Sequence, residues 1–222
     1  MSITSNLNSF LEELKGSNCQ LIAVSKTKPV TDIMELYHAG FKRFGENRVP
    51  ELVEKYQSLP KDIEWHMIGH LQTNKVKYIA PFVHLIHGVD SLKLAREIDK
   101  QAAKNDRIIP CLLQVHIAQE QNKFGFDGHE LYDLIRNGSF DEFPNLKISG
   151  LMGMATYTDD QEQIRREFRK LKALFDEINL QLLASNFNFT EISMGMSGDY
   201  QLAIEEGSTM IRVGSRIFGA RN

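Results

Sequence analysis

The chain contains 222 residues, of which 42% are hydrophobic and 25% charged, and its formal net charge is −3. This composition supports a full hydrophobic core and, with a pI near 6.2, offers no general positive field for nucleic acid. Two distant cysteines without Cys-x-x-Cys spacing, no leader-like N-terminus and no apolar run of about eighteen residues argue against a disulfide framework, secretion and membrane spanning, so we expect a cytoplasmic protein.

Strand-like and helix-like segments alternate along the chain after an amphipathic helix over residues 1–16. The predicted strands lie at 20–25, 43–47, 64–69, 84–88, 109–117, 147–154, 189–194 and 210–214. The predicted helices include 31–39, 47–58, 91–104, 127–137, 160–183 and 199–206, and the helix after the third strand has no assigned bounds. Three of these helices are followed by Gly40, Gly138 and Gly207, which is typical of left-handed C-caps.

This alternation predicts a (β/α)₈ TIM barrel with a helix after each of the first seven strands. The N-terminal helix then covers the barrel bottom or stands in for the closing helix. A doubly wound open sheet is the alternative, but no Gly-x-Gly-x-x-Gly follows the first strand. No linker rich in Pro, Gly or Ser interrupts the chain, and we expect a single domain over residues 1–222.

The first predicted strand runs into two lysines, Lys26 and Lys28, in the segment QLIAVSKTKP. Ile22, Val24 and Lys26 share one face of this strand, so the face directed at a packed interior finishes on an ammonium group. Such a lysine is most often a solvated strand end. If it is kept neutral by desolvation, it becomes a nucleophile that forms an imine with a carbonyl. Lys28 lies on the same predicted face and could compete.

In a barrel, chemistry takes place at the carboxyl ends of the strands. The residues predicted there are Lys26, Glu46, Asn47, His66, His70, Asp90, His116, Met152, Met154, Ser193 to Gly198, Gly214 and Ser215. Four histidines have no potential partner residue at a recognisable spacing. We expect surface or supporting roles for them: His38, His84, His87 and His129. Glu64, His66 and His70 superficially suggest a metal cluster, but they match no recognised ligand spacing, and we expect no metal site.

Two late loops resemble anion sites. Met196-Ser197-Gly198-Asp199 opens a helix and offers backbone N–H groups and a hydroxyl, and Gly214-Ser215 forms a second small turn. Barrels often bind phosphate in this pair of loops, although helix capping explains either loop alone. Together with a lysine at a strand end, they point to a ligand that carries an aldehyde and a phosphate. Pyridoxal 5′-phosphate (PLP) is such a ligand.

Arg212 lies on the Met210–Arg212–Gly214 face of the last strand and could point at the ring of this cofactor, although a salt bridge within the barrel is the alternative. A cation beside the pyridine nitrogen discourages its protonation and weakens the ring as an electron sink. Aminotransferase-type chemistry is then disfavoured.

Long motifs in this chain resemble a known family. They are AVSKTKP at 23–29, FGENRVPE at 44–51, EWHMIGHLQTNK at 64–75, Lys123-Phe124-Gly125, SGLMGM at 149–154 and SMGMSGDYQLAIEEGSTMIRVGSRIFGAR at 193–221. The chain is similar over nearly its whole length to the pyridoxal phosphate homeostasis protein family (YggS/PROSC-like), whose barrel is like the N-terminal domain of alanine racemase. Arg48 stands where bacterial members often have Tyr.

The resemblance implies a (β/α)₈ barrel that holds PLP on Lys26 as an internal aldimine. It also implies phosphate contacts from Ser197, Gly214 and Ser215, and a position for Arg212 near the ring nitrogen. The further residues that we expect to line the cofactor are Asn47, His66, Met152 and Ser193.

Fold-type III racemases carry a C-terminal β domain that supplies a second catalytic group, and no such domain follows the last predicted strand before Asn222. Because racemisation needs an acid/base on each face of the substrate carbon, we predict a non-catalytic PLP-binding protein of intracellular vitamin B6 homeostasis that delivers cofactor to apo-enzymes. One alternative is a small PLP-dependent amino-acid racemase or lyase, with Lys26 and either His66 or Tyr157 as bases. Another is a cofactor-free phosphate-sugar enzyme or lysine aldolase.

Overall fold

The computed structural model describes residues 2–119, 124–181 and 189–219. Eight parallel strands form a closed barrel in chain order, and β1 pairs with β8 to complete it. The strands are β1 Gln20–Val24, β2 Arg43–Glu46, β3 Glu64–Met67, β4 Leu85–Val89, β5 Ile109–Gln114, β6 Leu146–Met152, β7 Glu191–Met196 and β8 Met210–Val213. Each predicted strand is present, and the predicted (β/α)₈ barrel is confirmed.

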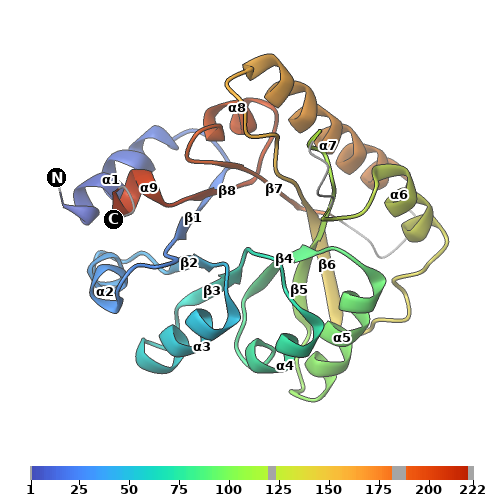
Figure 1. Ribbon diagram of the computed structural model, residues 1–222, viewed down its shortest axis with the longest axis horizontal. Coiled ribbons are helices and arrows are strands. Elements are labelled where there is room, and N and C mark those ends of the chain that lie inside the picture. Colours follow the sequence, from blue (N-terminus) through green and yellow to red (C-terminus); the bar gives the residue numbers. More distant parts are fainter. Residues whose placement is uncertain (1, 120–123, 182–188, 220–222) are drawn as a thin grey trace.

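Helices form a ring outside the strands (Figure 1). They are α1 Ile3–Glu13, α2 Val30–His38, α3 Val49–Ser58, the 3₁₀ turn η1 Thr73–Lys75, α4 Val76–Ile79, α5 Leu92–Ala103, α6 Gly128–Arg136, α7 Gln161–Gln181, α8 Tyr200–Glu205 and α9 Ser215–Phe218. The sequence patterns missed η1, α4 and α9, because segments of three or four residues are too short to show helical periodicity. Residues 182 and 183 of the predicted helix 160–183, and Lys123, lie outside the described residues.

The helix α1 packs beside α9, where the Asn6 side-chain amide donates a hydrogen bond to the Ile217 carbonyl (3.0 Å). The predicted N-terminal helix therefore joins a short closing helix, rather than replacing it. No helix within the described ranges is both long enough and apolar enough to span a membrane. Cys19 and Cys111 are both buried free thiols.

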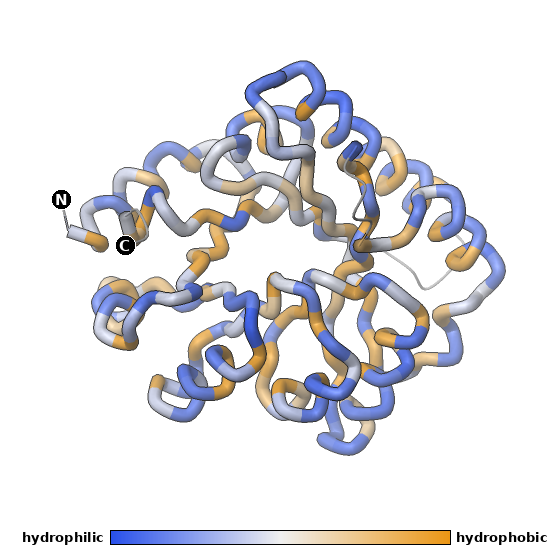
Figure 2. Tube along the Cα trace, in the orientation of Figure 1, coloured by the Kyte–Doolittle hydropathy of each residue, from blue (hydrophilic) through white to orange (hydrophobic). Residues whose placement is uncertain are grey.

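The hydrophobic core has two parts. The larger part fills the space between the strands and the ring of helices, and hydrophobic residues follow the strands in Figure 2. A small apolar cluster, Leu85, Leu112, Met152 and Met210, is separate from it. These four residues come from strands distributed around the barrel, which indicates that they plug its interior.

The barrel interior also contains buried polar side chains. Those of His66, His87, Ser193 and Arg212 are at most 4% exposed. A hydrogen bond joins His87 on β4 to Ser193 on β7, and because these strands are not neighbours, the bond crosses the interior. Buried polar groups need partners, so the identity of each partner determines what this interior can bind.

Candidate functional site

A tight turn follows β1 and carries Lys26. Its backbone closes through a hydrogen bond from the Lys28 N–H to the Ser25 carbonyl (3.0 Å), and Thr27 adopts a left-handed φ of +64°. The Thr27 N–H donates to the Glu51 carboxylate on α3 (2.6 Å), which compensates for a conformation that a β-branched residue rarely adopts. The lysine is half-buried at the carboxyl end of β1, where the sequence predicted it.

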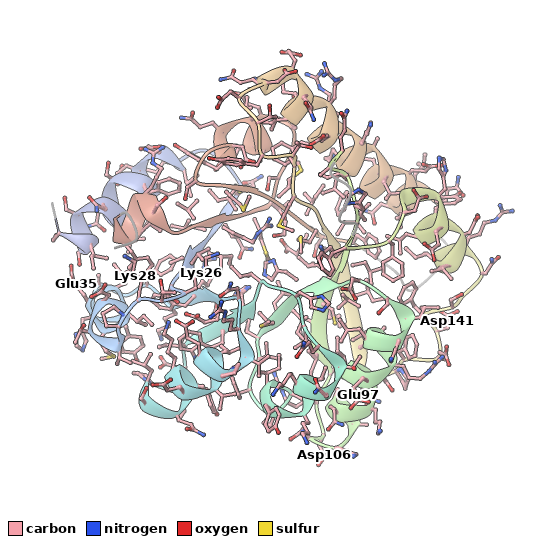
Figure 3. All side chains as sticks on the ribbon, viewed as in Figure 1. Lys26, Lys28, Glu35, Glu97, Asp106 and Asp141 are labelled. Atoms are coloured by element: carbon pink, nitrogen blue, oxygen red, sulfur yellow. The ribbon has the colours of Figure 1, made fainter. Side chains whose placement is uncertain are left out.

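The turn separates the two lysines. Because β1 ends at Val24 and Thr27 reverses the chain, Lys28 does not share the strand face of Lys26, and that part of the prediction is wrong. The Lys28 ammonium instead donates to the Phe218 carbonyl at the end of α9 (3.2 Å). Figure 3 shows both lysines in the region between α2 and α9. Lys28 is therefore a structural contact to the last helix.

A buried ion network supports this turn from behind. The Lys55 ammonium, on α3, donates to Glu46 (2.8 Å), to Glu51 (2.6 Å) and to the Ser25 carbonyl (2.8 Å). The Ser25 hydroxyl donates to the same Glu46 carboxylate (2.6 Å). Burial raises the pKa of Glu46, while Lys55 acts in the opposite direction. The network fixes the residue immediately before Lys26.

Glu46 belongs to the predicted set of residues at the strand ends, but its side chain does not face the barrel interior. An added Cβ at Gly45 would contact Ile22 at 3.0 Å and Ile68 at 3.1 Å, which places position 45 against the inward face of β1. Successive strand residues alternate between faces, so Glu46 points outward to Lys55. The sequence analysis missed Lys55, because nothing in a helical pattern marks one lysine as buried.

The two predicted phosphate loops meet at the ends of β7 and β8. The Gly214 N–H donates to the Ser197 hydroxyl (3.4 Å), which joins the loops directly. An added Cβ at Gly214 would lie 3.0 Å from the Val24 carbonyl oxygen, so the end of β8 lies against the end of β1, two residues before Lys26. Ser215 is exposed and begins α9, where the first N–H groups of a helix are directed outward.

Arg212 lies in the interior below these loops. Its guanidinium donates to the Ser193 hydroxyl (2.6 Å) and to the Gly153 carbonyl (3.3 Å). Burial lowers the pKa of Arg212 to about 10, and the nearby Asp199 opposes this shift, so the side chain stays cationic at neutral pH. Met152, 1% exposed, belongs to the apolar plug in the same interior. Arg212 is thus held by hydrogen bonds, and the predicted alternative of a salt bridge is not what fixes it.

Asn47 follows β2 and is half-buried. An added Cβ at Gly69 would lie 2.5 Å from the Asn47 carbonyl oxygen, so the absence of a side chain at position 69 lets the ends of β2 and β3 approach. Asn47 therefore follows the carboxyl end of β2, the strand next to β1, as the sequence predicted.

His66 does not join this group, which corrects its predicted contact with the cofactor. It lines a cavity of about 200 Å³ together with the first residues of several strands, at the amino-terminal mouth of the barrel. Its Nδ1 lies 2.9 Å from His87 Nε2, and His87 Nδ1 lies 2.9 Å from the Ser193 hydroxyl. His66 is connected to Arg212 only through this chain of hydrogen bonds. The lining of this cavity places His66 below the site.

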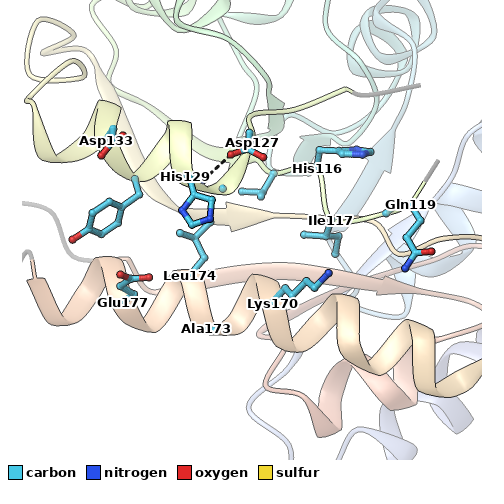
Figure 4. A pocket seen from close by; sticks show the side chains of 14 residues that line it. His116, Ile117, Gln119, Asp127, His129, Asp133, Lys170, Ala173, Leu174 and Glu177 are labelled. Carbon is cyan, nitrogen blue, oxygen red and sulfur yellow. Dashed lines mark hydrogen bonds between the residues drawn. The ribbon is translucent and has the colours of Figure 1, made fainter. Parts of the chain in front are cut away.

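Two other histidines of the predicted set lie elsewhere. His70 is exposed and pairs with Asp90 (3.0 Å). His116 lines a groove of about 1060 Å³ between α6 and α7, on the outside of the barrel (Figure 4). Asp127 caps α6 beside this groove by accepting from the His129 N–H (2.9 Å). His70 is thus directed to Asp90, and His116 to this outer groove.

The buried histidines give the folded state a pH dependence. Burial lowers the pKa of His66 to about 3 and that of His87 well below its usual value, whereas the unfolded chain takes up protons near pH 6.5. Stability is therefore present above pH 6.5 and lost as the pH falls, by about 1–3 kcal/mol between pH 7 and pH 5.5. Urea unfolding followed by the fluorescence of Trp65, the single and fully buried tryptophan, measures it.

A matched pair of variants isolates this effect from the opposing contribution of Glu46. His87→Asn should reduce the pH slope even where it lowers stability overall, and the exposed control His38→Ala should keep the slope of the parent protein. Equal slopes in both variants would contradict the assignment.

Comparisons with known proteins agree with this fold. Residues 1–222 match the family model described as alanine racemase, N-terminal domain. The pyridoxal phosphate homeostasis protein of Aquifex aeolicus is 44% identical over 209 residues, which cover 93% of this chain and 90% of that protein. The protein of the same name from Haemophilus influenzae is 38% identical over 215 residues, with 95% and 89% covered.

Solved structures give the same result. PipY of Synechococcus elongatus, solved without PLP, is 37% identical with a TM-score of 0.90, and 98% of this chain and 100% of that chain are covered. The structure of PipY with PLP bound has a TM-score of 0.86 at 36% identity, with the same coverage. An alanine racemase of Clostridium difficile, 14% identical over 99% of this chain and 57% of its own, shares the fold with a TM-score of 0.78. With relatives this similar over nearly its full length, the chain belongs to the pyridoxal phosphate homeostasis protein family, built on the barrel of the alanine racemase N-terminal domain.

Proposed function

We propose that this protein binds PLP at the carboxyl-terminal mouth of its barrel and acts in intracellular vitamin B6 homeostasis, holding the cofactor and delivering it to apo-enzymes. The observation that carries the proposal is the contact between the ends of β1 and β8. It sets the turn of Lys26 beside the Ser197 and Gly214 loops. The PLP-bound structure of PipY, a relative 36% identical to this chain, supports the same ligand.

The residues present fit the chemistry of this ligand. The Lys26 amine is the group that would bind the aldehyde covalently and reversibly. The Ser197 hydroxyl and the backbone N–H groups of Gly214 and Ser215 would hold the phosphate. Bound PLP supplies an electron-withdrawing ring. Asn47, Met152 and Ser193 would line that ring.

Arg212 supports binding without turnover. A guanidinium only donates hydrogen bonds, so beside the pyridine nitrogen it requires that nitrogen to stay unprotonated. The positions of the two residues that the sequence offered as a second base also argue against a racemase. His66 lies at the opposite mouth of the barrel, and Tyr157 is 98% exposed after β6. We therefore propose a non-catalytic role, with a small racemase or lyase as the alternative. The buried free thiols fit the predicted cytoplasmic location.

Two measurements on the PLP-loaded protein test this function. In deuterated buffer, L-alanine and D-alanine should exchange their α-protons at close to the background rate, because neither His66 nor Tyr157 is placed to act as a second base and the ring is a weak electron sink. Mixed with an excess of an apo-PLP enzyme, the protein should restore activity faster than an equal amount of cofactor released by dilution. Rapid exchange with inversion would establish a racemase, and cofactor that never leaves would contradict delivery.

A further inference from the structure

The amino-terminal mouth of the barrel holds a cavity that the proposed function does not use. Its volume is about 200 Å³, and its lining comes from the first residues of strands around the barrel. They include Gln20 on β1, Arg43 on β2, Glu64 on β3 and Glu191 on β7. This mouth lies at the opposite end of the strands from the turn of Lys26.

Three potential metal ligands meet in this cavity. One ring nitrogen each of His66 and His84 and one carboxylate oxygen of Glu64 lie within 4.8 Å of one another. Glu64 and His66 are two residues apart on β3, so both face the interior, and His84 directly precedes β4. The His84 N–H donates to the Trp65 carbonyl (2.8 Å), which fixes the third ligand beside the other two.

His66 has one ring nitrogen without a partner. Its Nδ1 is paired with His87, whereas its Nε2 is fully buried and makes no hydrogen bond. An unsatisfied buried polar atom costs free energy, so it calls for an explanation. A neutral imidazole nitrogen is a ligand for a transition metal.

We propose that Glu64, His66 and His84 form a binding site for a divalent transition metal, with Zn²⁺ as its preferred occupant. Two imidazoles and one carboxylate suit Zn²⁺, whereas Mg²⁺ and Ca²⁺ require oxygen ligands. Three protein ligands leave the remaining coordination position to water. The sequence expectation of no metal site considered His70 as the third ligand. The structure instead pairs His70 with Asp90 and brings in His84.

The interior hydrogen bonds provide the support that such a site needs. A metal on His66 Nε2 requires the proton to be on Nδ1, which then donates to His87 Nε2. The proton of His87 is then on Nδ1 and donates to the Ser193 hydroxyl, which also accepts from Arg212. This arrangement fixes the ring of His66 and directs its lone pair into the cavity.

The charges around the cavity set the strength of binding. Glu64 and Glu191 attract a cation, whereas Arg43 and Lys147 in the same lining repel it. Arg43 lies opposite Glu64 in the register of β2 and β3, and its guanidinium donates to the Gln20 side chain (3.0 Å). Removing the positive charge of Arg43 should therefore strengthen metal binding in the cavity. Binding at a site elsewhere on the surface would not depend on Arg43.

Calorimetric titration of the untagged full chain with zinc chloride tests the site. We expect one equivalent of Zn²⁺ per chain, no competition from Mg²⁺, and a Kd raised roughly tenfold or more in both Glu64→Gln and His84→Ala. His38→Ala removes a comparably exposed histidine and should leave the Kd unchanged, while Arg43→Gln should lower it. Co²⁺ bound in place of Zn²⁺ should lose its visible absorption in the two ligand variants.

The fluorescence of Trp65 verifies that each variant is folded, and Glu64 and His84 are sufficiently exposed to tolerate substitution. Three results would overturn the proposal: no stoichiometric binding of Zn²⁺, a Kd that Glu64→Gln and His84→Ala leave unchanged, or a loss of binding in His38→Ala equal to that in His84→Ala.

Discussion

Replacing Lys26 by alanine is expected to abolish covalent retention of PLP, whereas replacing Lys28 by alanine should leave it intact. The physical reason is the turn at Thr27, which presents the Lys26 amine at the carboxyl-terminal mouth and directs Lys28 to the Phe218 carbonyl. The two variants remove the same chemical group two residues apart, so they form a matched pair. Lys28→Ala should instead lower stability slightly, through the lost contact to α9.

Borohydride reduction followed by peptide mass mapping measures this result. A pyridoxyl group should be found on Lys26 alone in the parent protein and in Lys28→Ala, and on neither lysine in Lys26→Ala. A pyridoxyl group on Lys28 in the parent protein would overturn the assignment of the attachment residue. An unmodified parent protein, after incubation with excess PLP, would remove the basis of the proposed function.

The second large effect, a loss of both stability and PLP affinity, is expected on replacing Lys55, a residue outside the proposed ligand contacts. Lys55→Met keeps the volume of the side chain but leaves Glu46, with no exposed surface, as a buried carboxylate without a cation. Removing one partner of a buried ion pair typically costs about 3–5 kcal/mol. Because Lys55 also binds the Ser25 carbonyl, the turn of Lys26 should loosen, and PLP affinity should fall together with the free energy of unfolding.

Urea unfolding followed by Trp65 fluorescence gives the stability, and PLP titration gives the affinity. The control is Lys15→Ala, because Lys15 forms an exposed pair with Glu12 and should change neither quantity appreciably. The double variant Glu46→Gln/Lys55→Met should recover part of the lost stability, since it also removes the fully buried charge of Glu46 and leaves only the partly exposed Glu51 without its cation. A stable Lys55→Met protein with unchanged PLP affinity would show that the network does not support the turn.

The barrel could be predicted from the sequence because each βα unit carries its own local signals. Apolar strands, amphipathic helices and glycines at helix ends repeat in order, and only a few topologies join such units. The short helices α4 and α9 escaped prediction, since each is only four residues long. The turn at Thr27 also escaped it, because a positive φ at threonine has no sequence signal and is set by Glu51 from α3.

The site was harder to predict than the fold, because position along a strand and face of a strand decide which side chains meet. Glu46 and His66 both have the residue types of a binding site. One extra step along β2 turns Glu46 away from the interior. His66, although it is the third of the four residues of β3, lines the cavity at the far mouth. The partners His84, His87 and Lys55 could be found only from distances in space. Lys26, Ser197, Arg212 and Gly214, by contrast, could be predicted as site residues from their places at strand ends, and the resemblance to a family pointed to the same residues.

The pairing of β1 with β8 has a consequence for how the protein forms during synthesis. Gln20 bonds with the strand that contains Met210, so β1 keeps an unpaired edge until nearly the whole chain has left the ribosome. At about 5–20 residues per second, this delay lasts roughly 10–40 s. An open edge invites association with other nascent chains, and only closure of the barrel removes it. A ligand held between the loops after β1 and β8 stabilises the closed state alone, and would thereby act as a folding aid for its own binding protein.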